Sequence, residues 1–382
     1  MTNNFKNALG AFFIFLLAYL FYKYNIDYFN ILNNNVEFNF NFLQKSLGVS
    51  TSLVWKSNTW DLLQQFFLIY GAYFVFYYLW WGDNEWKPIF FWRGIKKLIL
   101  KLSPKNFNKQ ILNKEEKLAM LTMLVKFIYI PLMFTWFFTN LQSVVNILGN
   151  IDKYLLEKNF FYKSDTFIHF YFRHIHRLLF NLLFFIDVSI FLFGYTIELN
   201  FLNNKIKSVE PTLFGWLVAL SCYPLLNNYT NTILGWHSSN MPDFVALFGE
   251  KISFYNLSMI FGLLFVILIW IYVRASIALG FKASNLTNRW IVSHWPYKYI
   301  RHPAYICKNL ARIIWWLPVI VWLFTSKTGL DFKMILAVTG SLIWWCLIYH
   351  LRALTEERHL LQDPDYIEYT NKVKYMYIPK VF

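Results

Sequence analysis

The chain has 382 residues, of which 57% are hydrophobic, 22% are aromatic and only 15% are charged. Soluble domains carry about 45–50% apolar and about 25% charged residues, so this composition excludes an ordinary water-soluble protein and indicates the lipid bilayer as solvent. The net charge of +15 does not indicate nucleic-acid binding, because the cationic residues lie between apolar runs. We expect them to contact anionic lipid headgroups instead.

The apolar runs predict the helices in chain order, since a membrane-spanning helix needs about 20 mostly apolar residues. Candidate spans cover roughly residues 8–23, 61–81, 118–139, 178–199, 212–227, 257–279, 310–325 and 333–350. The first run lacks a small-residue cleavage site after it and is interpreted as a retained span. The fifth and seventh runs are short, and we expect them to tilt, re-enter or cross only partly. The fold class is therefore an all-α integral membrane protein with about eight transmembrane helices.

Lys and Arg residues predict the orientation, because they favour cytoplasmic loops. The 83–117 loop carries nine of them, and segments 280–309 and 351–382 carry five each, whereas segment 24–60 carries two. The 140–177 loop, with five, departs from this alternation. We expect an integral protein of a bacterial inner membrane with both termini in the cytoplasm.

Two charged residues lie within predicted spans, where charges are costly and usually paired or functional. The depths of Lys126 and Asp187 differ by about 6 Å at 1.5 Å per residue, so they are predicted to pair directly, with a substrate or ion site, or a misplaced span, as the alternatives. The three cysteines, Cys222, Cys307 and Cys346, are far apart and form no CxxC or CxxH pattern. This spacing excludes a disulfide framework and a zinc site, and we assign no metal site.

Two polar segments flank the last helical hairpin. The first is "GFKASNLTNRWIVSHWPYKYIRHPAYICKN" (residues 280–309), and the second is "HLRALTEERHLLQDPDYIEYTNKVKYMYIP" (residues 350–379). Pro296 and Pro303 forbid a continuous helix in the first segment. Non-helical backbone near a membrane must be covered by protein or line a cavity. Its donors and aromatic rings suit an adenosine, a carboxylate and a sulfonium together, although an interfacial loop against lipid headgroups has the same composition.

This arrangement resembles the isoprenylcysteine carboxyl methyltransferase superfamily, which also includes phospholipid N-methyltransferases. Those proteins share "GPYxxxRHPxYxG", a helical hairpin, and then "RxxxEExxL…GxxYxxYxxxVxxxxP". The resemblance covers about the last 130 residues. It implies a membrane methyltransferase core over residues 251–382, after an N-terminal transmembrane region, residues 1–250, of unknown role. The implied activity is methyl transfer from S-adenosylmethionine to a lipid or lipid-linked acceptor that enters from the bilayer.

The resemblance also implies site residues, matched one by one. Those implied to bind the cofactor are Ile291, Val292, Tyr297, His302, Pro303, Ala304, Tyr305 and Glu356. Arg352 is implied to face the methyl acceptor as the catalytic and substrate-binding residue, and Lys308 and Asn309 are predicted to bind this chain's own substrate. Arg352 and Glu356 are spaced i, i+4, so an ordinary helix ion pair worth about 0.3–0.5 kcal/mol is the alternative. The neighbouring Glu357 is interpreted as structural.

Some residues depart from the family pattern. Trp295 and Cys307 stand where the family has glycines, and "DPDY" (residues 363–366) replaces "GxxY".

Two other function classes stay open. One is an NADPH-dependent sterol-type reductase, which shares the C-terminal architecture. The other is a non-enzymatic membrane binding protein or transporter built on the same fold.

Overall fold

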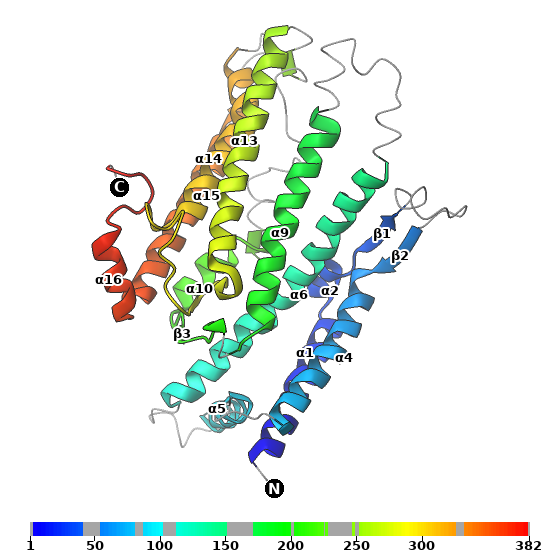
Figure 1. The fold of residues 1–382 in the computed structure, drawn as a ribbon, viewed down its shortest axis with the longest axis vertical. Helices are drawn as coiled ribbons and strands as arrows, with labels where there is room; N and C mark the ends of the chain where they lie inside the picture. The colour runs from blue at the N-terminus through cyan, green and yellow to red at the C-terminus, as the bar shows by residue number, and fades with distance from the viewer. Residues whose placement is uncertain are drawn as a thin grey trace.

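The computed structural model describes residues 3–40, 54–80, 87–101, 112–150, 171–199, 202–224, 226–227, 247–248, 252–325 and 332–380. This part of the chain is mostly helical (Figure 1), and seven of its helices are long and apolar enough to cross a membrane. They are α1 (Asn3–Tyr24), α4 (Thr59–Trp80), α6 (Lys114–Gly149), α9 (Arg177–Thr196), α13 (Ile252–Leu279), α14 (Pro303–Thr325) and α15 (Phe332–Leu360). The prediction of an all-α integral membrane protein is confirmed.

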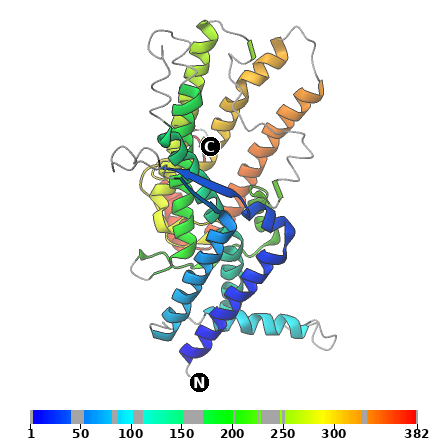
Figure 2. The same cartoon turned by 90° about the vertical axis from the view of Figure 1, so that its right-hand side faces the viewer.

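Shorter elements connect these helices. They are α2 (Ile26–Leu32), β1 (Asn35–Asn39), β2 (Val54–Asn58), α5 (Lys87–Lys101), η2 (Tyr171–His176), β3 (Ser208–Val209), α10 (Leu213–Leu220), η4 (Gly280–Lys282), β4 (Thr287–Asn288) and α16 (Pro364–Lys372). Figure 2 shows the amphipathic helix α5 lying across the direction of the spanning helices. In Figure 1, α1 begins and α15 ends toward the lower side of the molecule, where α5 also lies.

The expected span over residues 212–227 is not a spanning helix. Its helical part, α10, has eight residues and ends at Leu220. At 1.5 Å per residue it is about 12 Å long, far short of the roughly 30 Å hydrocarbon layer. The short seventh run, residues 310–325, belongs instead to a helix of 23 residues, because α14 already begins at Pro303.

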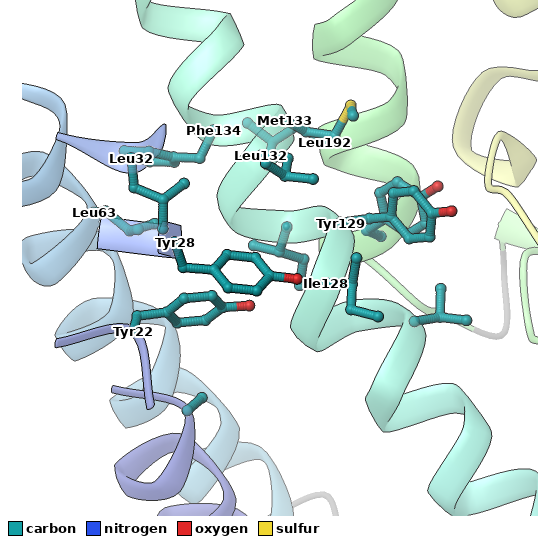
Figure 3. Packing of buried hydrophobic residues seen from close by; sticks show 14 of the residues in the cluster. Tyr22, Tyr28, Leu32, Leu63, Ile128, Tyr129, Leu132, Met133, Phe134 and Leu192 are labelled. Atoms are coloured by element: carbon teal, nitrogen blue, oxygen red, sulfur yellow. The ribbon is translucent and has the colours of Figure 1, made fainter. Parts of the chain in front are cut away.

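The largest apolar core joins the N-terminal helices to α6 (Figure 3). Tyr22, Leu32 and Leu63, from α1, α2 and α4, are fully buried against the α6 side chains around Leu132. On the other side of α6, Tyr129 stacks on Tyr195 of α9, with ring centroids 5.2 Å apart. The helix α6 therefore links the N-terminal pair of helices to α9, which in turn packs against α13.

Two small antiparallel sheets fix the loops. In the first, β1 pairs with β2 in the register Asn35↔Asn58 and Asn39↔Val54. In the second, β3 pairs with β4 through Ser208↔Asn288 and Val209↔Thr287. The second sheet attaches the segment after α9 to the loop that follows α13.

A buried cluster of charges corrects the predicted pairing of Lys126. The Lys126 Nζ atom lies 3.1 Å from Glu198 Oε2, and Lys87 of α5 binds the same carboxylate, so the predicted Lys126–Asp187 pair is wrong. Burial opposes ionisation of Glu198, but the charges of Lys126 and Lys87 outweigh it and hold the pKa of this carboxyl well below its ordinary value. Asp187 instead accepts hydrogen bonds from Tyr272 and Ser276 of α13.

Candidate functional site

The polar loop, residues 283–302, is held in a fixed path between α13 and α14. Gly280 has a φ of +53°, a left-handed conformation that glycine adopts without strain and that lets the chain turn away after α13. The buried Arg289 side chain then donates to the Asn204 carbonyl at 2.6 Å and the Gly194 carbonyl at 2.8 Å. Pro303 begins α14, a position where its missing N–H costs nothing. The loop is therefore ordered by protein contacts at both ends.

The C-terminal tail returns across this loop and brings the two polar segments together. The backbone N–H groups of Arg301 and His302 donate to the carbonyls of Tyr375 and Met376, each at 3.0 Å. The Arg301 guanidinium also donates to the carbonyls of Val373 and Lys374. The segments that flank the last hairpin in sequence thus form one continuous surface in space.

The two adjacent glutamates of α15 differ in how closely their partners hold them. Glu357 lies 2.6 Å from Arg301 Nε and 3.1 Å from His302 Nε2, which fixes the loop to the helix and fits its structural interpretation. Glu356 accepts a hydrogen bond of 2.6 Å from the Tyr305 hydroxyl and lies 3.9 Å from His302 Nδ1, and its side chain keeps 39% exposure. Glu356 is therefore the carboxylate that remains available to a ligand.

A cavity of about 890 Å³ lies between α9, α13, α14, α15 and the polar loop. This volume is within the roughly 300–1,000 Å³ typical of small-molecule sites. Each helix presents one face to the cavity, because the lining residues are three or four positions apart. They are Tyr305, Lys308 and Arg312 on α14, and Trp345, Tyr349 and Arg352 on α15.

The predicted site residues converge on this cavity, with one exception. Those that line it are Ile291, Val292, Tyr297, His302, Pro303, Ala304, Tyr305, Lys308, Arg352 and Glu356. Asn309 does not line it, and its Oδ1 atom is buried without a hydrogen-bond partner in the described part of the chain. The binding roles of these lining residues stay predictions, but residues from both polar segments line the same cavity.

The cavity changes character along its length. Its loop end is formed by Tyr297, His302, Tyr305 and Glu356, together with Tyr366 and Tyr369 of α16. Burial, followed by the charge of Glu356, raises the pKa of Tyr297 well above its ordinary value, so this phenol stays protonated. Its aromatic end is formed by Phe265, Trp315, Trp316 and Trp345, which lie deeper among the spanning helices. A ligand with a polar head and an apolar body matches this change.

Arg352 lies between the two ends. Its Nη2 group donates to Asn285 Oδ1, and its guanidinium carbon lies 5.4 Å from the centroid of the Tyr305 ring. No ion pair joins Arg352 to Glu356, both of which are within the described chain, so the ordinary i, i+4 pair is not formed. The guanidinium is held by a neutral amide and aromatic faces, which leaves its charge for another partner.

Several lining residues were not predicted as part of this site. Asp187 was noted in the sequence only for its charge, and Arg312, four residues after Lys308 in an apolar helix, carried the same signal without being singled out. Arg312 lies 4.3 Å from the centroid of the Trp345 ring. Asn285 and Tyr223 carried no sequence signal, because only the fold brings them to Arg352.

Trp295 and Cys307, two departures from the predicted motif, lie beside the cavity rather than in it. Trp295 packs against Trp270, with 5.9 Å between the ring centroids. The guanidinium carbon of Arg274 lies 5.4 Å from the centroid of the Trp295 ring. Cys307 is buried in the contact between α13 and α14. Neither side chain lines the cavity, so neither substitution fills it.

No protein-family model, curated protein or solved structure matches the chain. Among the described residues, no three His, Cys, Asp or Glu side chains are grouped so as to hold a metal ion. The interpretation of the cavity therefore depends on its own geometry and chemistry.

Proposed function

We propose that the protein is an integral-membrane S-adenosylmethionine-dependent methyltransferase, acting on a lipid or lipid-linked acceptor that enters from the bilayer. The observation that carries this proposal is the cavity itself. Two polar segments, separated by a helical hairpin and resembling the motifs of one methyltransferase superfamily, meet at its loop end. The other end is aromatic and lies among spanning helices, where a hydrocarbon chain would be soluble.

The residues at the loop end fit the proposed cofactor. Glu356 offers a partly exposed carboxylate for hydroxyl or ammonium donors, and Tyr297, Tyr366 and Tyr369 offer aromatic surface. Asn288 also lines the cavity, and its buried Oδ1 atom has no hydrogen-bond partner in the described chain. Buried acceptors of this kind are normally satisfied, so an unpaired one at this end fits a ligand that donates to it. Bound S-adenosylmethionine supplies a methyl group activated on a cationic sulfur.

The chain's own residues then have three tasks. The aromatic walls exclude water, and their faces stabilise a nearby cation by about 0.5–2 kcal/mol each. Arg352 orients an acceptor by its charge, because its guanidinium is not neutralised by Glu356. Holding both reactants in line is the largest contribution, worth up to about 7–11 kcal/mol in the best intramolecular cases. A carboxylate acceptor needs no base at neutral pH, since its pKa is about 4.

Equilibrium binding to the detergent-solubilised protein tests the proposal. We expect S-adenosylhomocysteine to bind and NADPH not to bind at the same concentration. Preferential binding of NADPH would replace the methyltransferase by the reductase, and binding of neither would favour a non-enzymatic membrane protein. Incubation of lipid extracts with methyl-labelled cofactor and the wild-type protein then identifies the fraction that becomes labelled.

A further inference from the structure

The middle of the cavity holds cations that no carboxylate neutralises by a close ion pair. Lys308 Nζ lies 4.1 Å from the centroid of the Tyr272 ring, and the Arg312 guanidinium carbon lies 4.3 Å from that of Trp345. Within the described chain, neither side chain has an Asp or Glu oxygen within salt-bridge distance. Aromatic faces hold both groups in place without cancelling their charge.

Among the described residues, the carboxylates that line the cavity are Glu356 at the loop end and Asp187, which is already hydrogen-bonded. Asp187 faces the same cavity, and its charge acts on Lys308 at longer range. Both of its oxygens, however, accept hydrogen bonds from Tyr272 and Ser276. With Arg352 included, three cations share this region with one carboxylate, so the middle of the cavity carries an excess of positive charge among spanning helices.

Helix geometry gives the depth of each cation. The Tyr305–Glu356 hydrogen bond marks the loop end of both α14 and α15, which run in opposite directions. At 1.5 Å per residue, Lys308 lies about 4.5 Å beyond Tyr305, and Arg352 lies about 6 Å beyond Glu356. Arg312 lies about 10.5 Å beyond Tyr305, and Trp315 and Trp316 about 15–16.5 Å beyond it. The order from the loop end inward is therefore carboxylate, first cations, second cation and then indole rings.

We propose that Lys308 and Arg312 form an anion-binding subsite for a phosphate ester, located deeper in the membrane than the loop end of the cavity. This inference rests on the proposed function and deepens it. It assigns the acceptor three parts: a methyl-accepting atom beside Arg352, a phosphate between Lys308 and Arg312 about one to two helical turns from the loop end, and a hydrocarbon chain between Phe265, Trp315 and Trp316. Unpaired buried cations are costly unless a counter-ion binds them. The guanidinium fork of Arg312 matches the oxygens of a phosphate.

Matched lipids of the same chain length test this subsite. The probes are dioctanoyl phosphatidic acid, dioctanoylglycerol and inorganic phosphate, each titrated into the full-length protein in a non-ionic detergent. We expect phosphatidic acid to bind at least tenfold more tightly than dioctanoylglycerol, and inorganic phosphate to bind weakly. Lys308→Met and Arg312→Gln should each weaken phosphatidic acid binding at least tenfold. Arg312→Lys, which keeps the charge but loses the fork, should have an intermediate affinity.

Arg274→Gln is the control, because Arg274 packs on Trp295 and does not line the cavity. This variant should bind phosphatidic acid as the wild type does. Equal binding of dioctanoylglycerol and phosphatidic acid, or unchanged affinity in both Lys308→Met and Arg312→Gln, would overturn the subsite. Inorganic phosphate binding as tightly as phosphatidic acid, with the same dependence on Arg312, would overturn the lipid source of the phosphate.

S-adenosylhomocysteine binding, measured on the same samples, separates this inference from the function beneath it. Retained cofactor binding in Lys308→Met and Arg312→Gln shows that the variants are folded, so their loss of phosphatidic acid affinity supports the subsite. Cofactor binding without preference for phosphatidic acid overturns the subsite and keeps the methyltransferase. A phosphatidic acid preference that depends on Arg312, in a wild-type protein that binds no cofactor, keeps the subsite and removes the proposed function.

Discussion

Glu356 and Glu357 are neighbours in sequence, yet only one of them faces the cavity. Glu357 is held by Arg301 and His302, whereas Glu356 receives a single hydrogen bond from Tyr305. Adjacent residues of a helix point about 100° apart, so one can fix the loop while the other meets a ligand. The cavity therefore tolerates a change at Glu356 without loss of the contact that attaches the polar loop.

A pair of substitutions separates the cofactor role from the acceptor role. Glu356→Gln removes a charge at the loop end, so we expect S-adenosylhomocysteine affinity to fall about tenfold, or about 1.4 kcal/mol. Arg352→Ala should abolish turnover and leave that affinity largely unchanged, because Arg352 lies deeper and is proposed to contact the acceptor. Isothermal titration measures the first effect, and transfer of labelled methyl groups to the identified lipid fraction measures the second.

Glu368→Gln is the matched control for this pair. Glu368 is exposed on α16 and is bound to Lys372 at i, i+4, away from the cavity. It should leave both affinity and turnover as in the wild type. If Glu356→Gln behaves like this control, the cofactor role of Glu356 is wrong. If Arg352→Ala keeps full turnover, the acceptor role of Arg352 is wrong.

Residue patterns predicted which residues line the cavity better than they predicted the contacts between those residues. The "RHPAY" and "RALTEE" stretches carry most of the predicted residues, because each is a local sequence that can be compared as a unit. Asn285 meets Arg352 from 67 residues away, and no spacing rule reaches that far. Lys126 was predicted to meet Asp187 from depth alone. Depth says nothing of direction around a helix, and Glu198, just beyond the end of α9, is the actual partner.

At the scale of elements, apolar runs predicted helices well where lipid is the reason for their composition. The α10 run is apolar only partly for this reason, because Leu213, Phe214 and Leu217 are exposed whereas its other face is buried in protein. Trp216 is buried and donates to the Glu210 carbonyl, and a Cβ atom at Gly215 would lie 2.5 Å from Glu210 Cγ. The helix thus packs closely against its own preceding turn and against α15. Burial in protein and burial in lipid give the same composition, so the sequence could not distinguish them.

The start of α16 is attached to the rest of the protein by charged residues, so the stability of this attachment depends on pH. Asp363 caps this helix by accepting from the Asp365 N–H, and it also binds Asn288 and Lys207. Burial would raise the pKa of the Asp363 carboxyl, but the hydrogen bonds from Asn288 and Lys207 outweigh it and hold that pKa below its ordinary value. Burial would likewise lower the pKa of Lys207, but Asp365 and Asp363 raise it above its ordinary value.

The signs of these shifts predict where α16 stays attached. The Asp363 contribution is fully present above its unfolded pKa, about 3.9, and is lost as pH falls through the lower folded value. The Lys207 contribution is present below its unfolded pKa, about 10.4, and is lost as pH rises through the higher folded value. Proteolytic resistance of α16 should therefore be constant from about pH 5 to pH 9 and decrease in acid.

Asp363→Ala should destabilise this attachment by about 1–2 kcal/mol, the cost of a lost N-cap, with Asp365→Asn as its control. Asp365 meets the same lysine but is 57% exposed, so its loss should cost only a few tenths of a kcal/mol. Amide exchange of α16 peptides at pH 7 measures the difference. Equal exchange in the two variants would contradict the capping role of Asp363.

At the scale of the whole molecule, helices from the N-terminal region form one wall of the cavity. Phe180 and Asp187 of α9 and Trp136 of α6 line it, although the predicted methyltransferase core, residues 251–382, does not include them. Glu198 adds a second connection, because it binds Lys87 of α5, Lys126 of α6 and the N–H of Ile206. The N-terminal helices thus shape part of the cavity in which the acceptor is proposed to bind.

The same Lys87–Glu198 contact puts α5 on the side of the membrane where the loop end of the cavity lies. Glu198 follows α9 directly, and Arg289 of the polar loop binds the Gly194 carbonyl at the end of that helix. The loop with the most Lys and Arg residues therefore shares a side with the proposed cofactor residues. Because S-adenosylmethionine is a water-soluble molecule of the cell interior, that side must be the cytoplasm if the proposed function is right.

Cysteine labelling on either side of α4 tests this orientation. Lys56 of β2 precedes α4 and is 71% exposed, whereas Lys96 of α5 follows it and is also exposed. The 22 residues of α4 separate them by about 33 Å, enough to cross the hydrocarbon layer. In a background without Cys222, Cys307 and Cys346, an impermeant maleimide should label Lys56→Cys in intact cells. It should label Lys96→Cys only after permeabilisation, because the loop richest in Lys and Arg stays inside.

Labelling of Lys96→Cys in intact cells, with Lys56→Cys protected, would reverse the orientation. The loop end of the cavity would then face away from the cofactor supply, and the methyltransferase proposal would fail with it.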